Sequence, residues 1–286
     1  MTTFQDLLNE GTRRLAGGDT SSPRLDAEVL LRFLAGIDRS RLFVLLPETA
    51  PDDLAAPYRQ AVARRLAGEP VAYITGHREF MGQAFRVAPG VLIPRPETEL
   101  LVEWALETLA RMESPRVVDA GTGSGAIAVS LTALAKFPLE IVATDVSAEA
   151  LLVANSNRHD LLDDERRTWL AFRQGSLLEP VTEPVDLVLA NLPYLTPEQI
   201  AGNPELEAEP RLALDGGSDG LDLVRALVAD LPRVLAPGGG VGLEIDPLQA
   251  RVVTAMLRTL YPDRTVRTIV DLAGHIRHIV LDPERG

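Results

Sequence analysis

The sequence contains no cysteine among its 286 residues. This absence excludes disulfide bonds, thiolate metal sites and cysteine nucleophiles, and we assign no metal ligands. The apolar runs are broken by Ser, Thr or charged residues well short of a membrane span, and residues 1–15 lack the apolar segment of a signal peptide. We therefore expect a soluble, cytoplasmic protein with no membrane partner.

Basic residues are scarce relative to acidic ones, because 28 Lys and Arg against 41 Asp and Glu give a net charge of −13. Proteins whose main partner is DNA or RNA usually carry a basic surface that neutralises phosphates. The charge therefore argues against nucleic acid as the main partner, although a local basic patch stays open. An acidic surface favours a small ligand or a basic protein partner.

Two short regions precede the main domain. Apolar residues at helical spacing, with Ser22-Pro23 as a cap and first helical residue, predict a small helical bundle over residues 1–72. The spacing then changes to alternation over 79–87 and 91–94, which predicts a β-hairpin in a connector at 73–95. The remainder, 96–286, is expected to form the main domain.

Strands and helices alternate from Arg116 onward. This alternation predicts an α/β fold with a doubly wound parallel sheet that helices cover on both faces. A tight Leu-Ala-Gly turn joins the last two strands, which must therefore pair antiparallel. The expected strands are 116–120, 140–145, about 169–173, 185–190, 240–246, 265–271 and 275–281.

A glycine-rich loop, Asp119–Gly125, follows the first of these strands. Ligands of such sheets bind beyond the carboxyl ends of the strands, and glycines let the backbone turn tightly and approach a ligand next to free helix N–H groups. The spacing also satisfies a relaxed dinucleotide fingerprint. Asp119 at the strand end, however, would repel a pyrophosphate and suit an ammonium group, which argues against NAD.

Asp145 ends the next strand and is a candidate for binding both hydroxyls of a ribose. The alternative is a helix N-cap, for which Ser147 is the better candidate. A third loop, Asn191-Leu192-Pro193-Tyr194, follows strand 185–190 and could be an ordinary turn. We favour a holder for a planar NH2 group, because a carboxamide oxygen and a backbone carbonyl can accept its two N–H bonds.

Together these loops resemble class I S-adenosylmethionine-dependent methyltransferases that methylate planar nitrogen. Further stretches resemble the PrmC/HemK family of N5-glutamine methyltransferases, which act on peptide chain release factors. The resemblance covers essentially the whole chain, and its motifs occur in the family's order. These stretches are 22–27, 69–76, 79–82, 91–99 and 209–221.

The resemblance implies a seven-stranded, mostly parallel sheet with a C-terminal antiparallel hairpin, plus a small N-terminal helical domain that recognises the substrate protein. It implies S-adenosylmethionine as cofactor, S-adenosylhomocysteine as product, class I peptide chain release factors as partners, and a monomer. The substrate and catalytic residues implied are Asn191, Leu192, Pro193 and Tyr194. The cofactor-binding residues implied are Asp119, Gly121, Thr122, Gly123, Ser124, Gly125, Asp145, Leu177 and Asn191.

Two positions depart from the family pattern. Leu192 stands where the family usually has proline, which predicts a less rigid loop. The loop sequence Asn-Leu-Pro-Tyr is also found in ribosomal RNA adenine dimethyltransferases. Ser176-Leu177 replaces an acidic residue and an aromatic, so apolar packing from Leu177 is expected to hold adenine. The alternatives are a nucleic-acid adenine-N6 methyltransferase and a non-enzymatic binding module. No catalytic role falls to His77, His159, His275 or His278.

Overall fold

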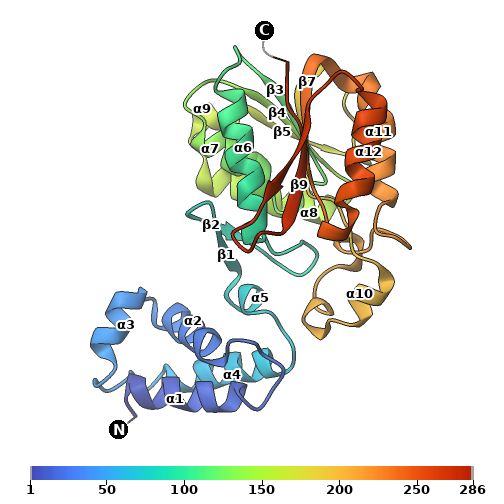
Figure 1. The fold of residues 1–286 in the computed structure, drawn as a ribbon. Helices are drawn as coiled ribbons and strands as arrows, with labels where there is room; N and C mark the ends of the chain where they lie inside the picture. Colours follow the sequence, from blue (N-terminus) through green and yellow to red (C-terminus); the bar gives the residue numbers. More distant parts are fainter. Residues whose placement is uncertain (1, 285–286) are drawn as a thin grey trace. The chain divides into compact units, whose positions relative to one another are not determined.

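The computed structural model describes residues 2–284, which form two compact units (Figure 1). One unit holds residues 2–77 together with Pro204–Ala208, and the other holds Arg78–Asn203 and the described residues from Glu209 onward. The predicted division at residues 72 and 95 stays a prediction. Within residues 2–284 no helix is both long and apolar enough to cross a membrane.

The first unit is helical, and its core is apolar. Thr3 begins α1 with a capping box, in which its hydroxyl accepts the Asp6 N–H at 3.1 Å. A Cβ on Gly11 would lie 1.9 Å from the Tyr58 hydroxyl, so only glycine lets α1 and α4 pack this closely. The helices are α1 (Phe4–Leu15), α2 (Pro23–Ala35), α3 (Arg39–Leu45), α4 (Ala55–Leu66) and α5 (Val71–Thr75).

The predicted hairpin forms from a shorter stretch than expected. Strands β1 (His77–Phe80) and β2 (Gln83–Arg86) pair in a sheet of their own around a turn at Met81-Gly82. The expectation of a strand at 91–94 is wrong, because this segment is irregular. Pro94 has no N–H for a ladder, and a side chain outside any sheet binds the Ile93 N–H.

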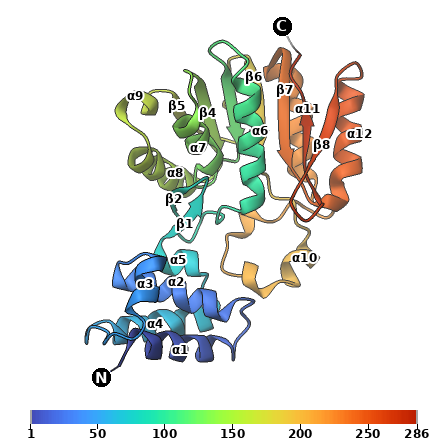
Figure 2. The same cartoon turned by 60° about the vertical axis from the view of Figure 1, so that its left-hand side comes forward.

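The second unit is built on a seven-stranded sheet of order β5-β4-β3-β6-β7-β9-β8. Strands β3 to β7 run parallel to one another (Figure 2), and β9 is antiparallel to both β7 and β8. The predicted fold class is therefore confirmed, including the C-terminal hairpin. The strands are β3 (Arg116–Ala120), β4 (Glu140–Asp145), β5 (Leu170–Gln174), β6 (Val185–Ala190), β7 (Leu235–Glu244), β8 (Val266–Val270) and β9 (Ile276–Leu281).

Helices cover both faces of this sheet (Figure 1). Successive strand residues point to opposite faces: Val117 and Leu187 pack with α6 and α7, whereas Val118 and Val188 pack with α11 and α12. The helices are α6 (Glu99–Leu109), which continues a 3-10 turn at Pro96–Thr98, α7 (Ala126–Leu134), α8 (Ala148–Leu161), α9 (Asp164–Arg167), α10 (Pro197–Ala201), α11 (Asp222–Val234) and α12 (Ala250–Leu260).

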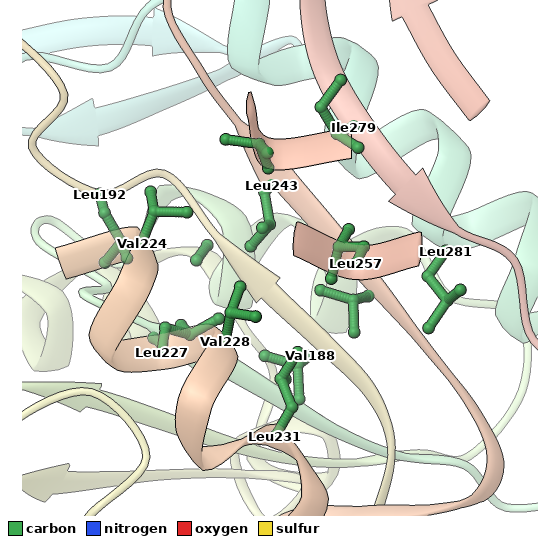
Figure 3. Packing of buried hydrophobic residues seen from close by; sticks show 14 of the residues in the cluster. Val188, Leu192, Val224, Leu227, Val228, Leu231, Leu243, Leu257, Ile279 and Leu281 are labelled. Atoms are coloured by element: carbon green, nitrogen blue, oxygen red, sulfur yellow. The ribbon is translucent and has the colours of Figure 1, made fainter. Parts of the chain in front are cut away.

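The core under α11 and α12 consists mainly of branched aliphatic side chains (Figure 3). Leu227, Leu231, Leu257 and Leu281 have no exposed surface there. Each such side chain contributes about 1.5–3 kcal/mol of hydrophobic free energy. Leu192, from the loop after β6, also lies in this core next to Val224.

The register of the central strands aligns the loops that follow them. Ala120 at the end of β3 pairs with Thr144 of β4 on one side and with Ala190 of β6 on the other. The loops after β3, β4 and β6 therefore begin side by side at one edge of the sheet. The strand order changes direction between β3 and β6. Open α/β sheets bind their ligands at this switch point.

Candidate active site

A pocket lies beyond the carboxyl ends of β3, β4, β5 and β6, and its lining comes from the second unit. The glycine loop, the end of β4 and the loop after β6 all contribute to it, as the sequence predicts. Segments 90–92 and 210–213 add an apolar wall. The lining residues are Gly90, Val91, Leu92, Gly121, Gly123, Asp145, Val146, Ser147, Ala150, Ser176, Leu177, Asn191, Leu192, Pro193, Pro210, Leu212, Ala213 and Leu223.

The glycine loop needs glycine for two different reasons. Gly121, Gly123 and Gly125 have φ of 73°, 57° and 81°, a region that side chains disfavour. A Cβ on Gly121 would lie 3.0 Å from the Leu192 side chain, whereas nothing lies within 4 Å of a Cβ on Gly123. The space beside Gly123 is therefore open to the pocket, and a ligand can approach the backbone there.

Asp119 lies beneath this loop and has no exposed surface. Its Oδ2 accepts the Thr122 hydroxyl at 2.6 Å and the Ala128 N–H at 3.2 Å, while Oδ1 has no partner among residues 2–284. Burial raises the pKa of Asp119 to about 7. Through these two hydrogen bonds Asp119 ties the loop to α7. It is not among the lining residues, and its contact with a cofactor stays a prediction.

Asp145 lines the pocket from the end of β4. Its Oδ2 accepts the Gly123 N–H at 2.8 Å, and its Oδ1 accepts the Ser147 N–H at 2.9 Å. Ser147, and not Asp145, caps α8 by accepting the Ala150 N–H at 3.1 Å. A carboxylate has about four acceptor positions, so Asp145 can still accept hydroxyl groups of a ligand.

Leu177 follows β5 in a left-handed conformation, with φ of 48°. This conformation costs a leucine about 1–2 kcal/mol. The Thr144 hydroxyl donates to the Leu177 carbonyl at 2.6 Å and holds the turn in place. The result is an apolar side chain that lines the pocket where adenine packing is predicted.

The Asn-Leu-Pro-Tyr loop has a hydrogen bond at one end and an apolar anchor in its middle. Asn191 lines the pocket, and its Nδ2 donates to the Thr98 hydroxyl at 3.0 Å. Leu192 is 3% exposed and packs against Val224 (Figure 3). The side chain that replaces the family's proline thus holds the loop to the core, and the lower rigidity expected for it stays a prediction.

Tyr194 lies at the far end of this loop and does not line the pocket. Burial, and secondly the charge of Glu244, raise the pKa of Tyr194 above its ordinary value. Its hydroxyl therefore stays protonated over the physiological pH range. Tyr194 is suited to packing and hydrogen bonding rather than to proton abstraction.

Segment Leu214–Gly220 supports the backbone of the Asn-Leu-Pro-Tyr loop. The Leu195 N–H donates to the Leu214 carbonyl at 3.0 Å. The buried Gln249 donates from Nε2 to the carbonyls of Tyr194 at 2.9 Å and Gly220 at 3.1 Å. A Cβ on Gly220 would lie 2.1 Å from the Tyr194 oxygen, so glycine is required there.

Glu209 joins the two apolar wall segments. Its buried carboxylate accepts the Ile93 N–H at 3.0 Å and forms an ion pair with Arg95. One side chain therefore links the residues that directly follow segment 90–92 to the residue that directly precedes segment 210–213. The family resemblance includes both stretches, and the connector motif is expected near the cleft, with Arg95 and Glu97 as secondary candidates. The sequence does not identify the residues of these stretches that line the pocket.

The predicted site residues fall into two groups. Those that line the pocket are Gly121, Gly123, Asp145, Leu177, Asn191, Leu192 and Pro193. The others, namely Asp119, Thr122, Ser124, Gly125 and Tyr194, lie behind or beside the lining. The Ser124 carbonyl, for example, accepts the Asn157 Nδ2 at 2.8 Å and so joins the glycine loop to α8.

Family models match both parts of the chain. The PrmC N-terminal domain matches residues 6–76, and the methyltransferase small domain matches residues 97–209. Among solved structures, a Thermus thermophilus 16S rRNA N2 G1207 methyltransferase in complex with AdoMet and guanosine has a TM-score of 0.52 at 17% identity, covering 73% of this chain and 50% of that one. A human methyltransferase 10 domain containing protein has a TM-score of 0.52 at 14% identity, covering 70% and 88%. These likenesses show the fold.

The fold and the pocket define a class I methyltransferase. Two relatives are close over nearly their full length. A release factor glutamine methyltransferase of Moorella thermoacetica is 43% identical over 277 residues, covering 96% of each chain. The Deinococcus radiodurans protein of the same name is 39% identical over 278 residues, covering 96% of this chain and 97% of the relative. The chain belongs to the release factor glutamine methyltransferase family.

Proposed function

We propose that this protein transfers a methyl group from S-adenosylmethionine to the side-chain amide nitrogen, N5, of a glutamine in class I peptide chain release factors. The carrying observation is the position of Asn191, whose carboxamide lines the same pocket as the glycine loop and Asp145. The names of the full-length relatives support the choice of a release factor as substrate.

The residues present fit the cofactor. The open space beside Gly123 suits its methionine part, Asp145 has free acceptor positions for ribose hydroxyls, and Leu177 offers an apolar surface to adenine. The Oδ1 of Asp119, buried beneath the loop, has no partner among the described residues, and we propose that it interacts with the ammonium group of the cofactor. When bound, the cofactor supplies an electrophilic methyl group on sulfonium.

The protein's contribution is to orient a weak nucleophile. The lone pair of an amide nitrogen is delocalised into its carbonyl, so the nitrogen attacks only when it is aligned with the methyl group. Asn191 Oδ1 and the Leu192 carbonyl accept the two N–H bonds of the glutamine and favour pyramidalisation as the new bond forms. Alignment of this kind contributes up to about 7–11 kcal/mol in favourable cases.

No side chain is required as a base before attack. Methyl transfer makes the nitrogen acidic, and the proton then leaves readily. The histidines have no role in this mechanism: His278, for example, is fully buried and lies 3.4 Å from Glu244, and His275 lies next to Asp271. Catalysis therefore depends on position and hydrogen bonding.

The Asn191→Ala variant tests the proposed site. We expect its kcat to fall by about 10²–10³, the effect of removing one preorganised hydrogen-bonding group at a reacting centre. The Kd for S-adenosylmethionine should change only a few-fold, because the glycine loop and Asp145 are intact. Turnover within a few-fold of the wild type would exclude the role given to Asn191.

We further propose how the protein recognises its substrate, in which oligomeric state it acts and which partners it lacks. The helical unit is proposed to recognise the substrate protein, the enzyme is proposed to act as a monomer in the cytoplasm, and nucleic acid is not proposed as a direct partner. The net charge of −13 supports the last point. Sedimentation of the purified protein with and without a release factor measures both the oligomeric state and the complex.

A further inference from the structure

We propose that Thr98 is the positioning residue that sets the orientation of the Asn191 carboxamide; this inference rests on the proposed function of Asn191. Thr98 is 3% exposed and lies at the start of α6. Its hydroxyl oxygen accepts the Asn191 Nδ2–H at 3.0 Å. It is remote in sequence from the Asn-Leu-Pro-Tyr loop and acts on it from a different element.

The hydrogen bond holds the nitrogen end of a two-ended group at Thr98. A carboxamide carries an acceptor oxygen on one side and a donor nitrogen on the other. With Nδ2 held at Thr98, Oδ1 lies on the opposite side of the carboxamide, and no hydrogen bond to that oxygen is found among the described residues. The proposed reaction needs this arrangement, since an inverted carboxamide would present N–H bonds to the N–H bonds of the glutamine.

The backbone around Thr98 is fixed on both sides. Arg95, three residues before Thr98, forms an ion pair with the buried Glu209. The Arg95 carbonyl accepts the Thr98 N–H at 3.1 Å. The following residue, Glu99, accepts the Met81 N–H at 2.7 Å. Thr98 is therefore presented to Asn191 by a segment with little freedom to shift, which is what precise orientation requires.

Three variants separate positioning from packing. Thr98→Val removes the hydroxyl at nearly constant volume, and Thr98→Ser keeps it. Thr132→Val is the matched control, because Thr132 is also fully buried and its hydroxyl donates to the Ala128 carbonyl at 2.8 Å, within α7. Methyl transfer to a purified release factor gives kcat and KM, and calorimetry gives the Kd for S-adenosylmethionine.

We expect Thr98→Val to lower kcat by about 10- to 100-fold, the range for a misplaced group near the reacting atoms, and to leave the cofactor Kd within about twofold. Thr98→Ser should restore most of the turnover, and Thr132→Val should lose stability without losing turnover. In an Asn191→Ala background, Thr98→Val should cause no further loss, because the group that it orients is absent.

Full turnover in Thr98→Val, or an additive loss in the Asn191→Ala background, would overturn the inference. Crystal structures of the wild type and of Thr98→Val give a readout that needs no substrate. The inference requires that the Asn191 carboxamide rotates in the valine variant, and an unchanged carboxamide refutes it. Absence of methyl transfer by the wild type would instead refute the proposed function.

Discussion

Replacement of Gly220 by alanine probes how the substrate loop is supported. Gly220 has φ of 71°, and a Cβ there would lie 2.1 Å from the Tyr194 carbonyl oxygen and 2.4 Å from Gln249 Nε2. Neither neighbour can move freely, because one is backbone and the other is a buried amide bonded to that same carbonyl at 2.9 Å. The substitution must therefore displace the loop that carries Asn191.

The magnitude follows from two separable contributions. A left-handed alanine costs about 1–2 kcal/mol, offset in part by about 0.4–1 kcal/mol from the stiffer unfolded chain. Forcing a methyl group into occupied space adds about 1–3 kcal/mol. We therefore expect Gly220→Ala to lower the free energy of unfolding by about 2–4 kcal/mol.

Gly274→Ala is the matched control for conformational strain alone. Gly274 lies in the turn between β8 and β9 with φ of 84°, and a Cβ there would meet nothing within 4 Å. Its expected cost is about 1 kcal/mol with normal turnover. Denaturant unfolding and methyl transfer at saturating cofactor check both variants. Equal stability losses, or full turnover in Gly220→Ala, would refute the reasoning about the loop.

Two further variants test the cofactor side of the pocket. Asp119→Asn should remove a pH dependence of the free energy of unfolding. Burial raises the folded-state pKa of Asp119 from 3.8 to about 7. The free energy of unfolding of the wild type should therefore fall by up to about 4 kcal/mol relative to that of Asp119→Asn as the pH rises from 4 to 8. Denaturation midpoints of the two proteins without cofactor measure this difference, and parallel pH profiles would contradict it. Asp145→Ala should raise the Kd for S-adenosylmethionine about 10- to 100-fold, through lost charge-assisted hydrogen bonds, while kcat at saturating cofactor stays within a few-fold. An unchanged Kd by calorimetry would exclude Asp145 from the cofactor site.

The sheet could be predicted from sequence because its signals are local. The boundaries of β3, β4 and β6 agree with prediction, since each is a short apolar run that ends where a glycine, aspartate or asparagine begins a loop. The Leu-Ala-Gly turn likewise leaves β8 and β9 no option but antiparallel pairing. The parallel register of β3, β4 and β6 then places the loops that follow them at one edge of the sheet.

The wrong strand at 91–94 shows where local reasoning fails. Val91 and Ile93 alternate as strand residues do, yet the Ile93 N–H bonds to Glu209, 116 positions later in the chain. The same limit applies to the site. The sequence indicates only the backbone carbonyl and the φ of Leu192, whereas the burial of its side chain beside Val224 depends on α11. Contacts between distant segments decide such positions, and no periodicity encodes them.

The most direct test of the account is transfer of labelled methyl from S-adenosylmethionine, offered in parallel to a purified bacterial release factor and to ribosomal RNA. Mass spectrometry of the products identifies the methylated atom. We expect label on the side-chain nitrogen of one glutamine of the release factor, and no transfer to RNA. Label on RNA adenine, with none on the protein, would contradict it.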